Sequence, residues 1–268
     1  MNSSLSHPAR NPLPIGACIV AGNEAERIGR ALESLRPIVS EIVVVVDQRT
    51  QDETASIAAK YGAKVYQEPW KGFIGQKNSA SEKISQPWIL NLDADEALSP
   101  QLQTELQKLF LSKPHFLEKY AAFSIPRLSQ FCGRWIRHGD WYPDRQIRLW
   151  KRGAAHWAGE EPHAALRIQG RIGTLHAPIL HFPGDQLSFQ IQKALSYGQA
   201  FVEQCRRTGK KVHYYDLLIR PLWRFFRSYI LRLGFLDGWQ GCAVAWLVAT
   251  YTFLRYALAL QDQRKTPL

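Results

Sequence analysis

The chain has few cysteines: four in 268 residues, with no Cys-x-x-Cys pair among them. Their scatter argues against a zinc site and against a disulfide framework, and it fits a reducing cytoplasm. Residues 1–14 are polar and interrupted by proline, so they lack the apolar core of a signal peptide. Internal repeats and low-complexity tracts are also missing. We therefore expect a cytoplasmic protein with one sizeable core and an appended subdomain.

Acidic residues are in the minority, with 23 Asp and Glu against 34 Lys and Arg, and the formal net charge is +11. Much of the excess lies between residues 206 and 232. At about 100° per residue on a helix, Arg220, Arg224 and Arg227 fall within roughly 60° of one another. The opposite side is apolar and consists of Leu218, Leu222, Phe225, Tyr229 and Leu233. Such a helix suits the headgroup region of an anionic membrane.

A surface helix packed on the core is the alternative interpretation of this basic segment. Nucleic-acid binding is a weaker one, because the sequence contains no recognised nucleic-acid module. We therefore expect an anionic membrane surface as a partner and no nucleic acid.

Long hydrophobic runs are also scarce. The charge-free stretch from Gly238 to Leu254 has about 17 residues, near the short limit for a membrane span. Its aromatic residues are spread along it and do not gather at two ends. We expect an interfacial or re-entrant helix that packs with the preceding one, and a true membrane span is the alternative.

The most informative stretch of the sequence is 87–96, where a short apolar strand is followed by Asp93, Asp95 and Glu96. A strand this apolar belongs in the middle of a parallel sheet, and ligands bind just outside the carboxyl ends of such strands. Carboxylates so close together repel one another, so we expect a cation among them. Oxygen ligands of this kind suit Mg²⁺ or Mn²⁺. A solvated acidic turn before a helix that starts near Ser99 is the alternative.

The first 96 residues alternate between strands and helices. Apolar runs and helical spacing predict strands at Ile15–Val20, Ile42–Val46, Ala63–Tyr66 and Trp88–Leu92, and helices at Arg27–Leu35, Asp52–Lys60 and Gln76–Ile84. This alternation implies right-handed crossovers and a parallel sheet. The polar residues that follow three of the strands would share one edge of that sheet and form one site; they are Asn23, Glu24, Asp47, Asp93 and Asp95.

Four segments carry a recognisable pattern in a fixed order: Ala17–Glu24, Val46–Thr54, Trp70–Asn78 and Leu92–Glu96. Together they resemble the family 2 inverting glycosyltransferases of the GT-A fold. The likeness is greatest to the branch that adds β-linked glucose to the lipopolysaccharide or lipooligosaccharide inner core. It extends through Arg145–Trp150, Trp157–His163 and the basic C-terminal helices, so it covers nearly the whole chain.

The resemblance implies a Rossmann-like GT-A sheet flanked by helices and a reaction that uses a nucleotide sugar. Asn23, Glu24 and Asp47 would contact the base and ribose of the nucleotide. Asp95 would hold Mg²⁺ or Mn²⁺, and Asp93 would touch the ribose or the metal ion. From the residues alone, Asp47 is equally suited to capping a helix or turn.

Lys77 would meet the diphosphate, helped by the N-terminus of a helix that opens at Gln76. A surface lysine is the alternative. Asp52 is a weaker ligand candidate, because a carboxylate at the start of a helix also satisfies free backbone N–H groups.

Inversion also requires a carboxylate that removes the proton of the acceptor hydroxyl. In the family, an acidic residue lies around a Trp-x-Gly-x-x-Pro-His segment, commonly just after the histidine. Here the segment is Trp157–His163, and Ala164 follows it, which departs from the pattern. Glu161, nearer the histidine, or Glu160 would take the role, and two solvated glutamates in a loop are the alternative. Further candidates for substrate or metal contacts are His163 and His181.

These observations predict an α/β enzyme in three parts: a flexible tail at 1–14, a GT-A domain at 15–185 and a basic helical membrane-docking region at 186–268. It would transfer a hexose, glucose from UDP-glucose, to a lipid-linked core oligosaccharide at the inner face of the cytoplasmic membrane. The oligomeric state stays open.

Two other functions remain as alternatives. A sugar nucleotidyltransferase needs a glycine-rich loop with Arg and Lys after the first strand, and Gly22–Leu32 has only one early glycine before Gly29. A non-catalytic, membrane-associated protein that binds glycans or nucleotide sugars would fit Ala164, but the intact Asp93 and Asp95 argue against it.

Overall fold

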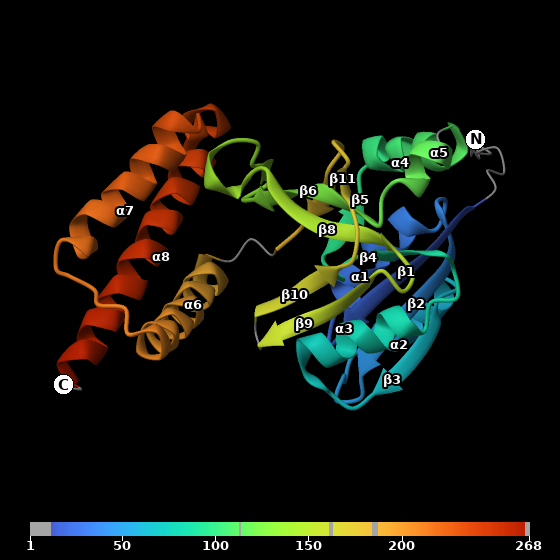
Figure 1. Ribbon diagram of the computed structural model, residues 1–268, viewed down its shortest axis with the longest axis horizontal. Helices are drawn as coiled ribbons and strands as arrows, with labels where there is room; N and C mark the ends of the chain where they lie inside the picture. Colours follow the sequence, from blue (N-terminus) through green and yellow to red (C-terminus); the bar gives the residue numbers. More distant parts are fainter. Residues whose placement is uncertain (1–11, 113, 161–162, 184–186, 266–268) are drawn as a thin grey trace, which may run out of the picture. The chain divides into compact units, whose positions relative to one another are not determined.

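A computed structural model describes residues 12–112, 114–160, 163–183 and 187–265. The chain divides into two compact units, whose elements are labelled in Figure 1. The first unit contains the residues up to Arg127 together with Arg145–His181, and the second contains Leu128–Asp144 and Phe182–Leu268. Each unit has hydrophobic clusters of its own.

The first unit is built on a sheet whose leading strands are parallel. They lie in the order β3-β2-β1-β4, with β1 at Leu13–Ala21, β2 at Val39–Asp47, β3 at Lys64–Glu68 and β4 at Trp88–Asn91. The helices between them are α1 (Ala25–Leu35), α2 (Thr54–Lys60) and α3 (Gly72–Glu82). The predicted alternation of strands and helices, and the parallel pairing that it implies, are therefore confirmed.

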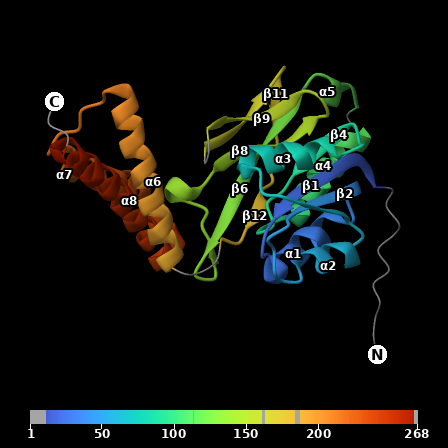
Figure 2. The ribbon, with the colours of Figure 1, turned by 90° about the horizontal axis from the view of Figure 1, so that it is seen from below.

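Both faces of this sheet are covered, which explains why its central strands are apolar along their whole length. On one face, Ile15 and Ile19 of β1 pack in a cluster with α1, α2 and α4 (Pro100–Ser112). On the other face, Cys18 and Val45 pack with Ala80 of α3. Figure 2 shows α1 and α2 on one side of the sheet and α3 on the opposite side.

Beyond β4 the sheet continues mainly with antiparallel strands. β8 (Asp144–Lys151) pairs with β4, and the order continues through β6 (Ala122–Phe131), β12 (Ile179–His181) and β5 (Glu96–Leu98). The smaller elements are α5 (Pro114–Glu118), β11 (Ile172–Thr174) beside β6, and a hairpin of β9 (Ala155–Glu160) and β10 (His163–Ile168). Pairing of β5 with β12 sets Glu96 opposite His181.

The third helix begins earlier than its spacing predicts. It starts at Gly72 and not at Gln76. Gly72 has φ +80°, a conformation that favours glycine, and this turns the chain into the helix one turn sooner. Lys77 therefore lies inside α3, and the expected help from a helix N-terminus at that lysine is wrong.

The second unit is mainly helical. Its elements are β7 (Arg134–Trp135), which pairs with the end of β6, the 3₁₀ turn η1 (Gly139–Trp141), α6 (Leu187–Thr208), α7 (Asp216–Phe226), the π-helical turn η2 (Arg227–Leu231), the 3₁₀ turn η3 (Gly234–Asp237) and α8 (Gly238–Lys265). Phe201 and Cys205 of α6 pack on Tyr256 of α8, and Phe225 of α7 lies 4.6 Å from Trp246 of α8 between ring centroids. α8 thus packs with the helix that precedes it, as expected.

One helical stretch of the described chain, Gly234–Arg264, is long and apolar enough by composition to cross a membrane. Of the apolar 18-residue segment within this stretch, 39% is buried inside the protein. The same helix therefore also serves as a core element of the second unit.

The predicted arginine face of α7 is engaged by carboxylates. Arg220 pairs with Asp216 one turn earlier in the helix, and both Arg224 and Arg227 pair with Asp140 of η1. The apolar side is divided: Phe225 and Tyr229 are half-buried, while the exposed residues are Leu218, Leu222 and Leu233. The helix therefore combines a packed side with an exposed apolar side.

Candidate active site

The carboxyl ends of β1, β2 and β4 lie along one edge of the sheet, as predicted from their order. The residues that follow or end these strands include Glu24, Asp52 and Asp95. Burial raises the pKa of Glu24; Arg27 lowers it, and the negative charges of Asp95 and Asp52 raise it. The acidic groups of separate strand ends therefore act on one another within one site.

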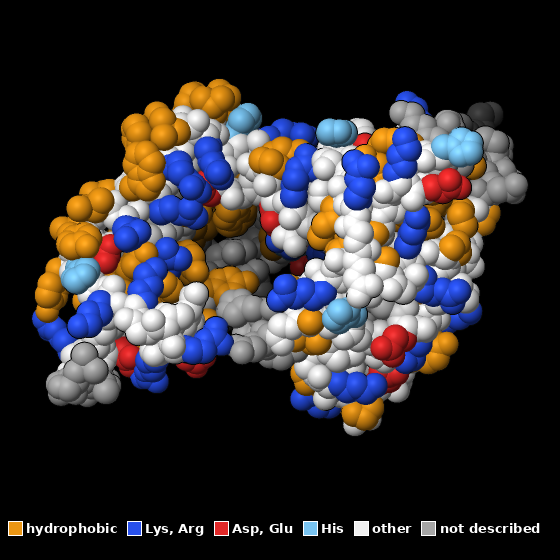
Figure 3. Space-filling view, viewed as in Figure 1, with side chains coloured by type: hydrophobic (Ala, Val, Ile, Leu, Met, Phe, Trp, Pro, Cys, Tyr) orange, Lys and Arg blue, Asp and Glu red, His pale blue; other side chains and the backbone are white. Residues whose placement is uncertain are grey.

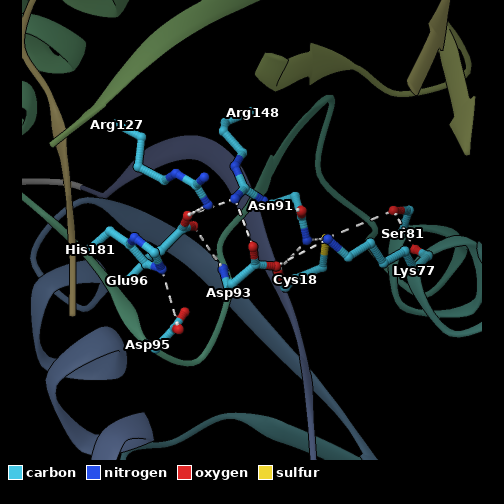
Figure 4. A network of polar contacts seen from close by, with 10 residues as sticks. All are labelled: Cys18, Lys77, Ser81, Asn91, Asp93, Asp95, Glu96, Arg127, Arg148 and His181. Carbon is cyan, nitrogen blue, oxygen red and sulfur yellow. Dashed lines mark hydrogen bonds and ion pairs between the residues drawn. The ribbon is translucent and has the colours of Figure 1, made fainter. Parts of the chain in front are cut away.

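Asp93 lies between two cations (Figure 4). Its Oδ1 is 3.1 Å from Nζ of Lys77, and its Oδ2 is 2.7 Å from Nη2 of Arg148. Burial opposes ionisation of Asp93, but the two cations outweigh it and hold the pKa of this carboxyl well below its usual range. Both oxygens of Asp93 are thus already engaged by protein side chains.

Arg148 is the centre of this network, and its side chain is only 5% exposed. Its Nη1 donates to Asn91 Oδ1 at 2.9 Å, and its Nη2 donates to Glu96 Oε1 at 2.6 Å. Arg127 lies 3.5 Å from the same Glu96 oxygen. Burial raises the pKa of Glu96, as does the neighbouring Asp93, against the lowering effect of the two arginines. Lys77, Arg148 and Arg127 therefore balance the charge of Asp93 and Glu96 within the protein, and a metal ion at Asp93 stays a prediction.

Asp95 is the remaining carboxylate of the three. It lies in the turn between β4 and β5 with its side chain 26% exposed, and its Oδ2 is 3.4 Å from Nε2 of His181 on β12. A carboxylate oxygen and an imidazole nitrogen form a donor set that Mn²⁺ accepts, so the two residues fit a divalent ion.

Within the described part of the chain, no three or more His, Cys, Asp and Glu side chains gather as a metal site. An ion on Asp95 and His181 would therefore draw its other ligands from water and from a diphosphate, which is how Mg²⁺ sites are commonly completed.

α3 carries two residues that contact the β9–β10 hairpin. Nζ of Lys77 lies 4.6 Å from the centroid of the Trp157 ring. The side chain of Asn78 donates to the Trp157 carbonyl at 2.9 Å and accepts from the Trp157 N–H at 2.8 Å. The hairpin is thus fixed to α3 next to the lysine that contacts Asp93.

The candidate base residues lie further along this hairpin. Glu160 ends β9 and His163 begins β10, and the two pair across the hairpin. Glu161 falls outside the described residues.

The loops after β1 and β2 are fastened to each other by polar side chains. Asn23, at φ +54°, accepts the N–H of Gln51 at 3.0 Å. Asp52 accepts the N–H groups of Ala25 at 2.9 Å and Thr54 at 3.0 Å. Asp52 therefore has the structural role that its position before a helix suggested.

Asp47 holds an arginine at the end of β2. The backbone N–H and the guanidinium of Arg49 donate to its carboxylate, and these hydrogen bonds lower the pKa of Asp47. The Arg49 side chain is 67% exposed and lies 6.0 Å from the ring of Trp70. An incoming polar ligand can therefore reach this pair.

Sequence reasoning missed Arg148, Arg127, Asn91 and Arg49 as members of the site. A signal for Arg148 was present, because it interrupts the otherwise apolar run Ile147–Trp150. An arginine buried in a strand needs an anionic partner, and the acidic cluster after β4 is the obvious one. Arg127 and Asn91 carry no comparable signal.

The chain is similar to known glycosyltransferases along most of its length. Residues 17–168 match the family model described as glycosyl transferase family 2. A protein named as an uncharacterized glycosyltransferase of Rickettsia felis is 33% identical over 91% of this chain and 88% of its own length. The lipopolysaccharide core biosynthesis glycosyltransferase LpsC of Rhizobium meliloti is 29% identical over 92% of this chain and 94% of its own.

Among solved structures, the mannosyltransferase PcManGT from Pyrobaculum calidifontis, in complex with GDP-Man and Mn²⁺, is similar with a TM-score of 0.52. The alignment covers 95% of this chain and 89% of that one at 14% identity, which bears on the fold alone. The expected GT-A fold is confirmed. Because the family model matches more than half of the sequence, the chain belongs to glycosyl transferase family 2.

Proposed function

We propose that this glycosyltransferase moves a hexose from a nucleotide sugar to a lipid-linked acceptor, with inversion at C1. The proposed donor is UDP-glucose, and the proposed acceptor is the inner core of lipopolysaccharide or lipooligosaccharide. The relative named for lipopolysaccharide core biosynthesis supports the acceptor. The donor rests on the resemblance of the four segments in the first 96 residues.

One observation carries the proposal: Lys77 and the Asp95–His181 pair lie on two sides of Asp93 at the carboxyl edge of the sheet. Cleavage of the bond between C1 and the diphosphate oxygen leaves negative charge on the diphosphate. The ammonium of Lys77, restrained by Asp93 and the Trp157 ring, would stabilise that charge. A divalent ion held by Asp95 and His181 would add Lewis-acid stabilisation of the same group.

The nucleoside would lie along the ends of β1 and β2. Asp47 would accept hydrogen bonds from the base or ribose in place of those from Arg49, whose side chain is exposed enough to move aside. Glu24 and Asn23 would line the same region, with Asn23 acting mainly through the loop that it fastens.

The general base is proposed to be Glu161, with Glu160 as the second candidate and His163 as a substrate contact. As the acceptor oxygen bonds to C1 from the side opposite the diphosphate, the carboxylate would take the hydroxyl proton. The two hydrogen bonds between Asn78 and Trp157 would hold the hairpin that carries these residues.

We also propose a cytoplasmic location with peripheral attachment to the inner face of the cytoplasmic membrane. Soluble nucleotide sugars and a lipid-linked acceptor would meet there. The exposed apolar side of α7 and the apolar composition of α8 support attachment to a membrane surface.

The proposal is tested by turnover. The protein is incubated with UDP-glucose, other UDP-hexoses or GDP-mannose, with Mn²⁺ or with EDTA, and with or without truncated core lipopolysaccharide. We expect Mn²⁺-dependent transfer from UDP-glucose and a β-linked product, identified by its anomeric NMR signal. Binding of UDP-sugars without transfer or nucleotide release would favour the non-catalytic alternative, which Ala164 suggests.

A further inference from the structure

Three arginines of the second unit converge on one buried carboxylate. The Asp140 side chain is only 3% exposed, and it lies 3.1 Å from Arg224, 2.8 Å from Arg227 and 2.9 Å from Arg232. Its backbone N–H donates to Ser228 Oγ at 3.1 Å. η1 is thereby fixed on the π-helical turn that follows α7, and the three guanidinium groups are held close together.

The cluster carries an excess of positive charge. Asp140 is the one carboxylate, among the described residues, with which all three arginines form ion pairs. Burial lowers the pKa of Arg224, and so do Arg227, Arg255 and Arg232, against the raising effect of Asp140. The three arginine side chains are still 30–48% exposed, so their remaining N–H groups can be reached by a ligand. Arranged donors of this kind suit the oxygens of a phosphate.

An exposed apolar surface lies on α7 and on the turn η2 that follows it. We define the α7 apolar surface by six side chains that are each 45–66% exposed: Leu218, Ile219, Leu222, Trp223, Phe226 and Leu231. Figure 3 shows hydrophobic side chains gathered over α7 at the outer side of the second unit, with Lys and Arg side chains next to them. Soluble monomers rarely expose so many large apolar side chains together, so this surface calls for an apolar partner.

We infer that Arg224, Arg227 and Arg232 form a binding site for the phosphate of an anionic phospholipid headgroup, whose charge no choline neutralises, and that the α7 apolar surface enters the acyl region beside it. A bilayer presents phosphate immediately above apolar chains, and α7 with the turn η2 and Arg232 after it carries both exposed arginines and exposed apolar side chains. Arg220 is outside the site, because it forms a pair with Asp216 on the same helix, whereas the other three arginines share the one carboxylate of Asp140. The inference names the surface by which the protein would attach to the membrane, and it rests on the proposed function.

The test is sedimentation of the full chain with vesicles. Donor and acceptor sugars are left out, so a lack of vesicle binding would not bear on the proposed transfer reaction. Three kinds of vesicle are used: phosphatidylcholine alone, phosphatidylcholine with phosphatidylglycerol, and phosphatidylcholine with oleate. The oleate vesicles contain the same amount of negative charge as the phosphatidylglycerol vesicles. R224Q/R227Q leaves Arg232 to pair with Asp140, and R206Q/R207Q removes the same charge from α6 as the matched control. R232Q, which changes the most exposed of the three, is the second variant should the first unfold on heating earlier than the wild type.

We expect the wild type to bind phosphatidylglycerol vesicles in preference to the other two kinds. At about 1 kcal/mol per basic residue, R224Q/R227Q should weaken partitioning by roughly 30-fold and R232Q by roughly 5-fold, with the α6 control losing clearly less. L218S/L222S should weaken binding at low and at high salt, because it removes the apolar contribution.

Three results would overturn the inference. Equal losses in R224Q/R227Q and R206Q/R207Q would mean that general charge, and not a site, attracts the membrane. Stabilisation by inorganic phosphate without vesicle binding would assign the arginines to a free anion. A dimer that L218S/L222S converts to a monomer, again without vesicle binding, would assign the apolar surface to a second copy of the chain.

Discussion

Arg148 and Asp93 form a hydrogen-bonded ion pair, with 2.7 Å between Nη2 and Oδ2, across 55 positions of sequence. The same nitrogen also donates to Glu96, whose side chain is fully buried. The arginine therefore sets the charge balance of the acidic turn after β4. Asp95, which lies between Asp93 and Glu96 in the turn, pairs instead with His181.

Replacing Arg148 should destabilise the protein strongly. R148M leaves Asp93 with Lys77 alone and Glu96 with the more distant Arg127, so two carboxylates lose their main partner. Breaking a buried pair in this way costs about 3–5 kcal/mol, and thermal unfolding should occur well below the wild-type temperature. R148K should recover little, because one ammonium cannot reproduce a guanidinium that also bonds Asn91. R152Q, in an exposed turn after β8, is the control, and equal stability of R148M and R152Q would contradict the argument.

The sequence predicts the parallel part of the sheet well, because strands buried on both faces leave continuous apolar runs. Val43, Val44 and Val45, for example, are all fully buried. It predicts the acidic turn equally well, since Asp93 and Asp95 are neighbours in sequence. It does not predict how that turn is neutralised, because Arg148 reaches it only through the antiparallel pairing of β8 with β4. Long-range pairings of this kind leave little periodic signal.

The same limit applies to His181 and to the start of α3. His181 reaches Asp95 because β12 pairs with β5, two strands of three residues each that lie far apart in sequence. Gly72 begins its helix through a positive φ, which hydrophobic spacing does not record. The base is a different case: the departure at Ala164 is visible in the sequence, and the role of Glu161 stays a prediction.

Replacing Asp95 should remove the dependence of UDP binding on a metal ion. D95N keeps the size of the side chain, so the fold should persist. It removes the charge that would attract a divalent ion. We expect Mn²⁺ to tighten UDP binding to the wild type and to lose most of that effect, about 10–100-fold, in D95N and in H181Q. Isothermal titration with UDP in Mn²⁺ or in EDTA measures the UDP affinity of each variant. E33Q, which changes an exposed residue of α1, is the control. UDP affinity that is the same with and without Mn²⁺ in the wild type would remove the metal from the proposal.

The base is tested by E161Q and E160Q, which are nearly isosteric changes. Loss of a general base should lower transfer by roughly 10²–10⁴-fold while UDP-glucose still binds. We expect E161Q to show this loss and E160Q to show a smaller one. The comparison of single-turnover transfer with donor affinity separates chemistry from binding. If E160Q is the variant that loses transfer, the base moves to Glu160, and if neither does, the hairpin does not supply it.

Glu68 should make the stability of the first unit depend on pH in the acid range. Lys83, at 2.6 Å, together with Ser79 and Lys71, lowers the pKa of Glu68 from 4.5 to about 2. A carboxyl whose pKa is lower in the folded state stabilises that state above the unfolded pKa, and the stabilisation disappears as pH falls from about 4.5 toward 2. E68Q should therefore reduce the free energy of unfolding by about 1–2 kcal/mol at pH 6, allowing for solvent screening of the exposed Lys71, and by much less at pH 2.5. Urea unfolding at the two pH values measures the difference, with the exposed α3 variant E82Q as control. A deficit in E68Q that is the same at both pH values would show that packing around the side chain, and not its charge, accounts for the effect.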